Sequence, residues 1–100
     1  MLKKRIKILL FATIANFAGW SVLLANDPEA RIKFEEALKS QENADYASAA
    51  EKYMDAAFLA NDKVLKINSL KSAADNFKKA KLYYKEFTAI EKILRNYPSD

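Results

Sequence analysis

From position 27 onward, apolar residues recur every three or four positions, with polar residues between them. This spacing is typical of amphipathic helices, in which one apolar stripe faces the core. No glycine follows position 19, and no stretch alternates apolar and polar residues as a strand would. The pattern therefore predicts an all-α fold with four helices. They are expected over about 28–42, about 46–60, from a cap at 61–62 to about 79, and over about 82–96.

Capping residues mark the helix boundaries. Asp27 is the expected N-cap of the first helix, with Pro28 at the first helical position, where a missing N–H costs nothing. Asn61 and Asp62 are expected to cap the third helix. Pro98 prevents continuation of the fourth helix, because the residue before a proline is biased away from helical angles.

The apolar stripes indicate which side chains form the core. The expected core residues are Ile32, Phe34, Ala37 and Leu38 in the first helix, Tyr46, Ala49, Ala50, Tyr53, Ala56 and Ala57 in the second, and Leu70, Ala73, Ala74 and Phe77 in the third. The fourth helix carries the apolar residues Phe87, Ile90, Ile93, Leu94 and Tyr97.

One spacing occurs twice, 37 residues apart. The positions of Ala44, Asp45, Tyr46, Ala49, Tyr53, Ala56 and Asn61 correspond to Lys81, Leu82, Tyr83, Glu86, Ile90, Ile93 and Pro98, and Ala37 corresponds to Ala74. A self-match at a fixed period is typical of arrays in which each unit packs on its neighbours. Arrays of this kind present a surface to a partner.

The first copy resembles the tetratricopeptide repeat, a helix-turn-helix unit of about 34 residues. Asp45 and Tyr46 stand at the turn, and Ala49, Tyr53 and Ala56 match the small–aromatic–small pattern of the second helix. The small residues allow a neighbouring helix to approach closely, and the tyrosine fills the space between them. The alternative is an ordinary antiparallel helical bundle, because a Tyr/Ala stripe at helical spacing is also common in cores.

The second copy matches the family on its first helix and departs from it elsewhere. Leu70, Ala73, Ala74 and Phe77 follow the family's first-helix spacing. Glu86 stands where a small residue is expected, while Pro98 matches the family's proline. In the first copy, Asn61 stands where the family has proline. In the first copy, Lys33 and Glu36 fall on positions that the family uses for core residues. The match improves if the alignment of this helix is shifted by one residue, so that Phe34, Ala37 and Leu38 take the core positions. The internal period of 37 exceeds the family's period of about 34 by three residues. The extra residues best fit positions 64–66, where they would add most of one turn to the start of the third helix.

The resemblance covers residues 29–98 and implies a short α-solenoid of two units, about 29–63 and 67–100. It implies a non-enzymatic scaffold for protein–protein interaction, like repeat proteins of the bacterial envelope. A protein or peptide partner would then lie along the concave face formed by the first helices. The implied groove residues are Arg31, Phe34, Leu38, Gln41, Asn68, Lys71, Asp75 and Lys78. The Lys/Asn set that clamps a terminal carboxylate in some members is not present as a set.

Two units are fewer than the roughly three that such arrays need for stability. The expectation is therefore that this chain is the amino-terminal part of a longer repeat protein, or that it stacks on another chain. The contact surface would be the apolar face that carries Ile90, Ile93, Leu94 and Tyr97.

The first 25 residues have the pattern of a secretory signal peptide. Lys3, Lys4, Arg5 and Lys7 precede an apolar run over 8–24, and Ala25 precedes a polar turn. Cleavage after Ala25 would give a domain of residues 26–100, exported to the bacterial periplasm or secreted. The alternative is an uncleaved inner-membrane anchor over 6–24, although the apolar run is shorter than the ~20 residues of a typical span. In that case the protein would be a membrane-anchored, self-assembling structural subunit.

The net charge of +4 comes from the N-terminal segment alone. Residues 26–100 hold 13 basic and 13 acidic side chains and therefore have no net charge, which removes the argument for nucleic-acid binding. The charge is unevenly placed, since residues 26–62 carry nine acids and four bases (net −5) and residues 63–100 carry four acids and nine bases (net +5). The two oppositely charged halves are either ordinary solvated helix faces or complementary ends of stacked units.

The residues that most enzymes and metal sites use are missing. The sequence has no histidine and no cysteine, so it lacks the commonest general base, a soft metal ligand and any disulfide. No enzymatic activity, cofactor or metal is expected. Lys78, Lys79, Lys81 and Lys85 lie near Tyr83 and Tyr84. That cluster would suit an anionic polymer or lipid headgroup, or else consists of lysines whose stems cover apolar surface.

The two interpretations of residues 1–25 differ in the mass of the finished protein. We expect protein made from its full reading frame in a bacterial host to begin at Asn26. Intact-mass spectrometry measures this directly. A mass that retains residues 1–25 would contradict the signal peptide and support the anchor.

Overall fold

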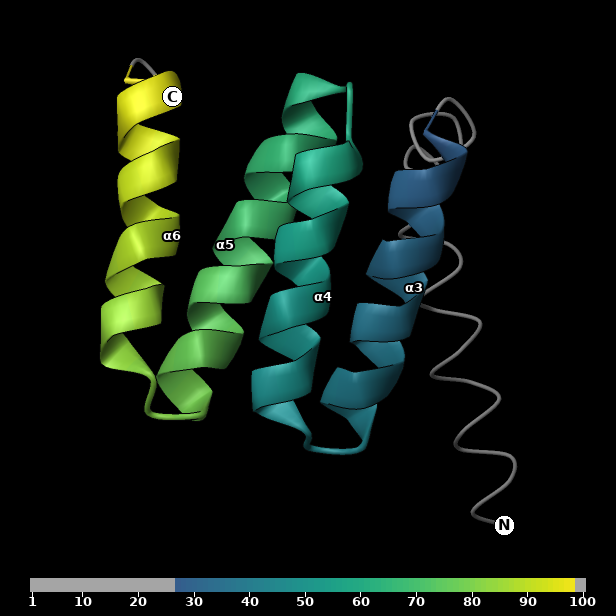
Figure 1. The fold of residues 1–100 in the computed structure, drawn as a ribbon, viewed down its shortest axis with the longest axis vertical. Helices are drawn as coiled ribbons and strands as arrows, with labels where there is room; N and C mark the ends of the chain where they lie inside the picture. Colours follow the sequence, from purple (N-terminus) through teal and green to yellow (C-terminus); the bar gives the residue numbers. More distant parts are fainter. Residues whose placement is uncertain (1–26, 99–100) are drawn as a thin grey trace, which may run out of the picture.

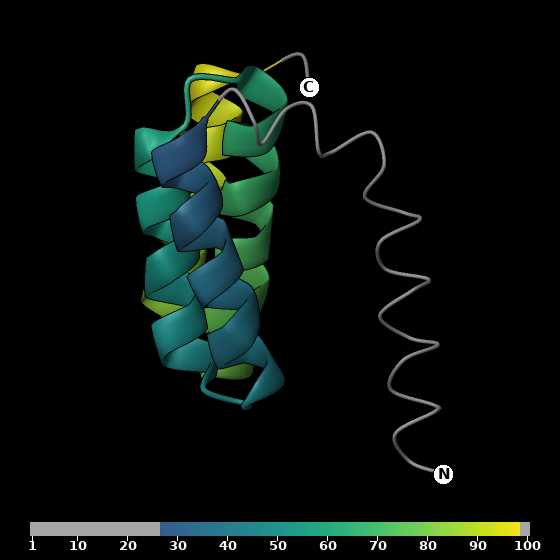
Figure 2. The same cartoon turned by 90° about the vertical axis from the view of Figure 1, so that its right-hand side faces the viewer.

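A computed structural model describes residues 27–98, and the predicted leader over 1–25 lies outside them. The described chain forms four α-helices, α3 (Pro28–Glu42), α4 (Tyr46–Leu59), α5 (Lys63–Lys79) and α6 (Tyr83–Asn96). Each helix packs against the next along the chain. Figure 1 shows the helices side by side in one row with α3 and α6 at its ends, and Figure 2 shows the same row from the α3 end. The all-α prediction is confirmed, with helix bounds within about one residue of those expected.

The 37-residue period is present in the backbone of the two turns at the ends of α3 and α5. Ala44 and Lys81 adopt left-handed φ angles of 61° and 62°. In each turn the residue that follows donates its backbone N–H to the carbonyl five residues earlier. Asp45 N donates to Ser40 O at 2.9 Å, and Leu82 N donates to Phe77 O at 2.8 Å. This pairing is a Schellman motif, which usually places glycine at the left-handed position. A residue with a side chain there costs roughly 1–2 kcal/mol, so the surrounding contacts must stabilise both turns.

The added residues lie at the start of α5. This helix has 17 residues against 15 in α3, although both end in the same kind of turn. Leu65 follows the added residues and corresponds to Pro28 of α3; it is completely buried, whereas Val64 is half exposed. The predicted extension at the start of α5 is present, but it consists of two residues at 63–64 and not of the three expected at 64–66.

Asp62 caps α5 as predicted, accepting a hydrogen bond from Leu65 N at 2.9 Å. The prediction for Asp27 was wrong in part, because it occupies the N-cap position of α3 but its carboxylate does not bond that helix. Instead it accepts from Asn61 N at 3.0 Å, Asn61 Nδ2 at 3.1 Å and Asp62 N at 3.0 Å. The reason is topological: α3 and α4 are antiparallel, so the α4–α5 loop reaches the start of α3. Asp27 thereby joins the first hairpin to the beginning of the second.

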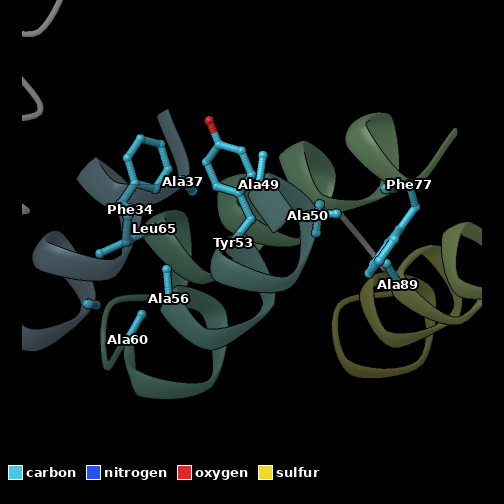
Figure 3. Packing of buried hydrophobic residues seen from close by; sticks show 13 residues of the cluster. Phe34, Ala37, Ala49, Ala50, Tyr53, Ala56, Ala60, Leu65, Phe77 and Ala89 are labelled. Atoms are coloured by element: carbon cyan, nitrogen blue, oxygen red, sulfur yellow. The ribbon is translucent and has the colours of Figure 1, made fainter. Parts of the chain in front are cut away.

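The core lies where α3, α4 and α5 meet and is built mainly from alanines around two rings. Phe34 and Tyr53 pack edge to face with centroids 5.2 Å apart. Figure 3 shows these rings beside Ala37 and Ala49, which are completely buried. The burial of Phe34 and Ala37, with Lys33 and Glu36 outside the core, matches the expected one-residue slip.

Some expected core residues lie elsewhere. Ile32 is half exposed, because it lies on the side of α3 that faces away from α4. Leu38 and Tyr46 are only partly buried. The core also contains Leu65 and Ala30, and Ala30 was not expected there.

The apolar residues of α6 are largely uncovered. Only Ala89 is buried on this helix, where Figure 3 shows it next to Phe77 of α5. Ile90 and Leu94 are 38% and 63% exposed, in line with the expected open face, whereas Ile93 and Tyr97 are partly buried. The array thus ends in an apolar helix face within the described chain.

The bonds of Asp27 predict a pH-dependent contribution to stability. The N–H groups of Asn61 and Asp62 lower the pKa of Asp27 below 3.8, because they favour the charged carboxylate. This contribution is fully present above pH 3.8 and is lost as the pH falls through the lowered pKa. We expect Asp27→Asn to lower the Tm at neutral pH, measured by circular dichroism, with the two proteins converging in acid.

The matched control is Asp55→Asn, which changes an exposed carboxylate on α4. It should leave the Tm nearly unchanged at neutral pH. An Asp27→Asn protein as stable as the native one at neutral pH would contradict the stabilising role of the Asp27 bonds.

Candidate functional site

A groove of about 430 Å³ runs between α3 and α5, with α4 forming part of its floor. Its lining residues are Phe34, Leu38, Gln41, Tyr53, Asn68, Lys71, Ser72, Asp75 and Asn76. The α3 residues recur at helical spacing on one face, as do those of α5, so the packing of both helices on α4 brings the two faces together.

A hydrogen-bond network holds the floor of the groove. Gln41 Oε1 accepts from Tyr53 Oη at 3.0 Å and from Asn76 Nδ2 at 3.0 Å. Asn76 Nδ2 also donates to Ser72 O at 2.8 Å, within α5. One amide oxygen therefore links α3, α4 and α5, which fixes the width of the groove at this point.

The side-chain carbonyl of Asn76 has no hydrogen-bond donor among the described residues. Asn76 is 1% exposed, and its Oδ1 is buried without a partner from the protein. The orientation of the Asn76 amide follows from the network, because Gln41 Oε1 and Ser72 O, which lie next to Nδ2, are both acceptors. A buried acceptor without a partner costs about 1–3 kcal/mol. The lining of the groove thus contains a buried acceptor that the described protein leaves unsatisfied.

Tyr53 acts in the floor as a permanent donor. Its phenol is almost completely buried, at 1% exposure. Burial, followed by the nearby negative charge of Asp75, raises the pKa of Tyr53 to about 12. The hydroxyl therefore keeps its proton at physiological pH and holds Gln41 in place.

The rim of the groove is charged and the wall is apolar. Lys71 and Asp75 are exposed on α5, and Asp75 pairs with Lys79 at 3.3 Å. Phe34 and Leu38 supply apolar surface on the α3 side. Such a site suits a segment that has both apolar side chains and backbone polar groups. Over residues 27–98 there is no group of three acidic, histidine or cysteine side chains that could hold a metal ion.

The structure brings six of the eight sequence-predicted groove residues to this groove: Phe34, Leu38, Gln41, Asn68, Lys71 and Asp75. Arg31 and Lys78 do not line it. Arg31 pairs with Glu35 at 3.4 Å on the exposed side of α3, and Lys78 is exposed near the end of α5.

Sequence reasoning missed three lining residues, Tyr53, Ser72 and Asn76. Tyr53 was assigned to the core alone, although its hydroxyl reaches the groove floor. The available signal for Asn76 was its position three residues after Ala73 and next to Phe77, where a polar residue interrupts a buried stripe.

Two lysines of the basic–aromatic cluster, Lys79 and Lys85, contact other parts of the protein. Lys79 Nζ lies 5.4 Å from the ring centre of Tyr46. Lys85 Nζ lies 5.9 Å from the ring centre of Phe77 and pairs with Glu51 at 2.9 Å. These contacts favour the interpretation in which the lysines cover apolar surface.

No family model matches this sequence, and no significant match was found among curated proteins or solved structures. The tetratricopeptide resemblance therefore rests on the spacing of residues described above. None of the helices within residues 27–98 combines the length and apolarity that crossing a membrane requires.

The network predicts that Tyr53→Phe destabilises the fold more at neutral pH than at alkaline pH. At neutral pH, loss of the bond to Gln41 should reduce the free energy of unfolding by about 1 kcal/mol. The raised pKa of Tyr53 stabilises the native fold below pH 10 and loses this effect as the pH rises toward about 12. Phenylalanine has no proton to lose, so the deficit should shrink above pH 10.

Urea unfolding at neutral pH and above pH 10 measures the free energy of unfolding of the native protein and of Tyr53→Phe. Tyr84→Phe is the control, because Tyr84 is 83% exposed. It should change the free energy of unfolding at neutral pH by less than about 0.5 kcal/mol. A deficit for Tyr53→Phe that is equal at both pH values would contradict the assigned effect of burial on the phenol.

Proposed function

We propose that the protein is a non-enzymatic scaffold of two tetratricopeptide-like units that binds an extended segment of a protein partner in the groove. The observation that carries the proposal is the buried, unpartnered carbonyl of Asn76 in the groove lining. A site that lacks a donor for a buried acceptor gains from a ligand that supplies one.

An extended peptide matches the chemistry of the groove. Its backbone offers N–H donors at regular intervals, one of which would bond Asn76 Oδ1. Its apolar side chains would contact Phe34 and Leu38, and charged side chains would meet Lys71 or Asp75. The floor network already joins three helices, which limits the ordering that binding requires, and a local shift of the groove lining would uncover the buried Asn76 Oδ1.

The repeat interpretation draws support from the two turns, which share a left-handed residue and the same hydrogen bonds 37 residues apart. The basic and apolar pattern of residues 1–25 supports export to the bacterial envelope. A second candidate is a membrane-anchored, self-assembling subunit that retains residues 6–24. The exposed apolar face of α6 favours it.

The peptide proposal is tested with short random peptides displayed on phage. Peptides enriched on the immobilised protein are synthesised with a fluorophore, and their Kd is measured by fluorescence anisotropy. We expect Lys71→Glu to change the Kd at least about tenfold, because it inverts a charge at the groove rim. Asn76→Leu should weaken binding in the same assay, because it removes the acceptor while keeping the side chain's size.

Lys78→Glu is the matched control, since it makes the same charge change on the same helix but outside the groove. It should leave the Kd within about twofold. The proposal fails if no peptide is enriched, or if Lys71→Glu and Lys78→Glu have equal effects. Circular dichroism of each variant confirms that the helices remain folded.

A further inference from the structure

One side of α6 carries a row of large apolar side chains that the described chain does not cover. We name this row the α6 stripe; it consists of Tyr83, Phe87, Ile90 and Leu94, which are 59%, 62%, 38% and 63% exposed. Their spacing of four, three and four residues places them on one face of the helix. A continuous exposed apolar face of this kind marks an interaction surface.

The equivalent row on α4 is covered by α5. Thirty-seven residues before the α6 stripe lie Tyr46, Ala50, Tyr53 and Ala57, of which the last three are buried. The helix α5 packs against α4, and Lys66 Nζ of α5 donates to Ala57 O at 2.9 Å. By the internal period, the α6 stripe occupies the place where a following first helix would pack.

The matching open surface is on α3, the first helix of the row. One row of α5 faces α6 through Phe77, and an adjoining row of the same helix is also buried, consisting of Leu65, Ser69, Ala73 and Asn76. Thirty-seven residues before that second row lie Pro28, Ile32, Glu36 and Lys39, all exposed. We name these four residues the α3 face; Ile32, at 50% exposure, is its one large apolar side chain.

Charge selects between two ways of pairing copies. The helix α3 carries four acids and three bases (net −1) within a half, residues 26–62, of net charge −5. The helix α6 carries two acids and three bases (net +1) within a half, residues 63–100, of net charge +5. Pairing α6 with α6 would bring two positive halves together. Pairing α6 of one copy with α3 of another brings opposite charges together, and like-charge contact is the costlier arrangement.

We propose that the α6 stripe of one copy is covered by the α3 face of a second copy, head to tail. The arrangement repeats within the assembly what α5 does to α4 within the chain. Because α5 begins where α4 ends, the start of the second copy's α3 lies near the end of α6, which places Ile32 close to Leu94. The contact is heterologous, so it leaves a free α3 face and a free α6 stripe for further copies.

The absence of cysteine from the sequence permits a direct test by disulfide cross-linking. Ile32→Cys and Leu94→Cys are introduced into separate, differently tagged copies made from the full reading frame. The proteins are purified in the processed form that the cells make, with mild detergent if residues 1–25 are retained. A disulfide forms only where the two Cα atoms approach within about 7 Å.

We expect the mixture of Ile32→Cys and Leu94→Cys copies to form a mixed dimer on mild oxidation. Its yield should exceed that of the matched pair Ile32→Cys and Ala47→Cys at least about fivefold, since Ala47 is exposed on α4 outside both surfaces. The yield should fall several-fold in 1 M salt, where the screening length is about 3 Å. Equal yields from both pairs would overturn the proposal, as would dimers of Leu94→Cys alone at the level of the mixture, which indicate α6–α6 pairing.

A second variant tests the direction of the contact and controls for folding. Phe87→Glu is placed in either the Leu94→Cys copy, which supplies the α6 stripe, or the Ile32→Cys copy, which supplies the α3 face. It should abolish the cross-link in the first case and leave it unchanged in the second. Equal loss in both cases would contradict a head-to-tail contact. The groove of the proposed scaffold is on other residues, so peptide binding should persist in Phe87→Glu.

Discussion

Tyr53 is the side chain on which the packing of the first three helices depends. Its ring contacts Phe34 edge to face, and the alanines at 49 and 56 on either side of it are completely buried. Small neighbours let the adjacent helices approach, so a single ring fills the remaining space and is shielded from water. A buried hydroxyl without a hydrogen-bond partner would destabilise the fold, and Gln41 Oε1 accepts a hydrogen bond from the Tyr53 hydroxyl at 3.0 Å. Core packing and the groove floor therefore share one residue.

Two of the polar contacts that position the helices span long distances in sequence. Asp27 bonds the α4–α5 loop, and Asn76 reaches Gln41, each across about 35 residues. These bonds join units that have small individual cores, and buried polar bonds specify a geometry more sharply than alanine contacts do. The groove gains a defined width from the same bonds. The proposed peptide would therefore meet a groove that is already ordered.

The two ends of the row differ in chemistry, and this difference bears on assembly. The outer side of α3 is mainly polar, with Ile32 as its one large apolar side chain, whereas the outer side of α6 is apolar and lies in the positively charged half of the chain. A repeat whose inner interfaces use alanine has Phe87 and Leu94 at the equivalent outer positions. Larger side chains at an uncovered position increase the apolar area that a neighbour would remove from water. The ends are thus complementary, while the groove is separate from both.

The sequence by itself determined the helices, the cap at Asp62 and the period of the turns, because periodicity and turn chemistry act over a few residues. It also placed most of the groove, since residues on one face of each first helix follow from helical spacing. Tertiary structure decided which apolar residues are covered: Ile32 and Phe87 fit an apolar stripe as well as Phe34 does, but no described helix packs on them. It also decided the partners of Asp27 and the role of Asn76, because these depend on which helices meet, and local spacing does not encode that.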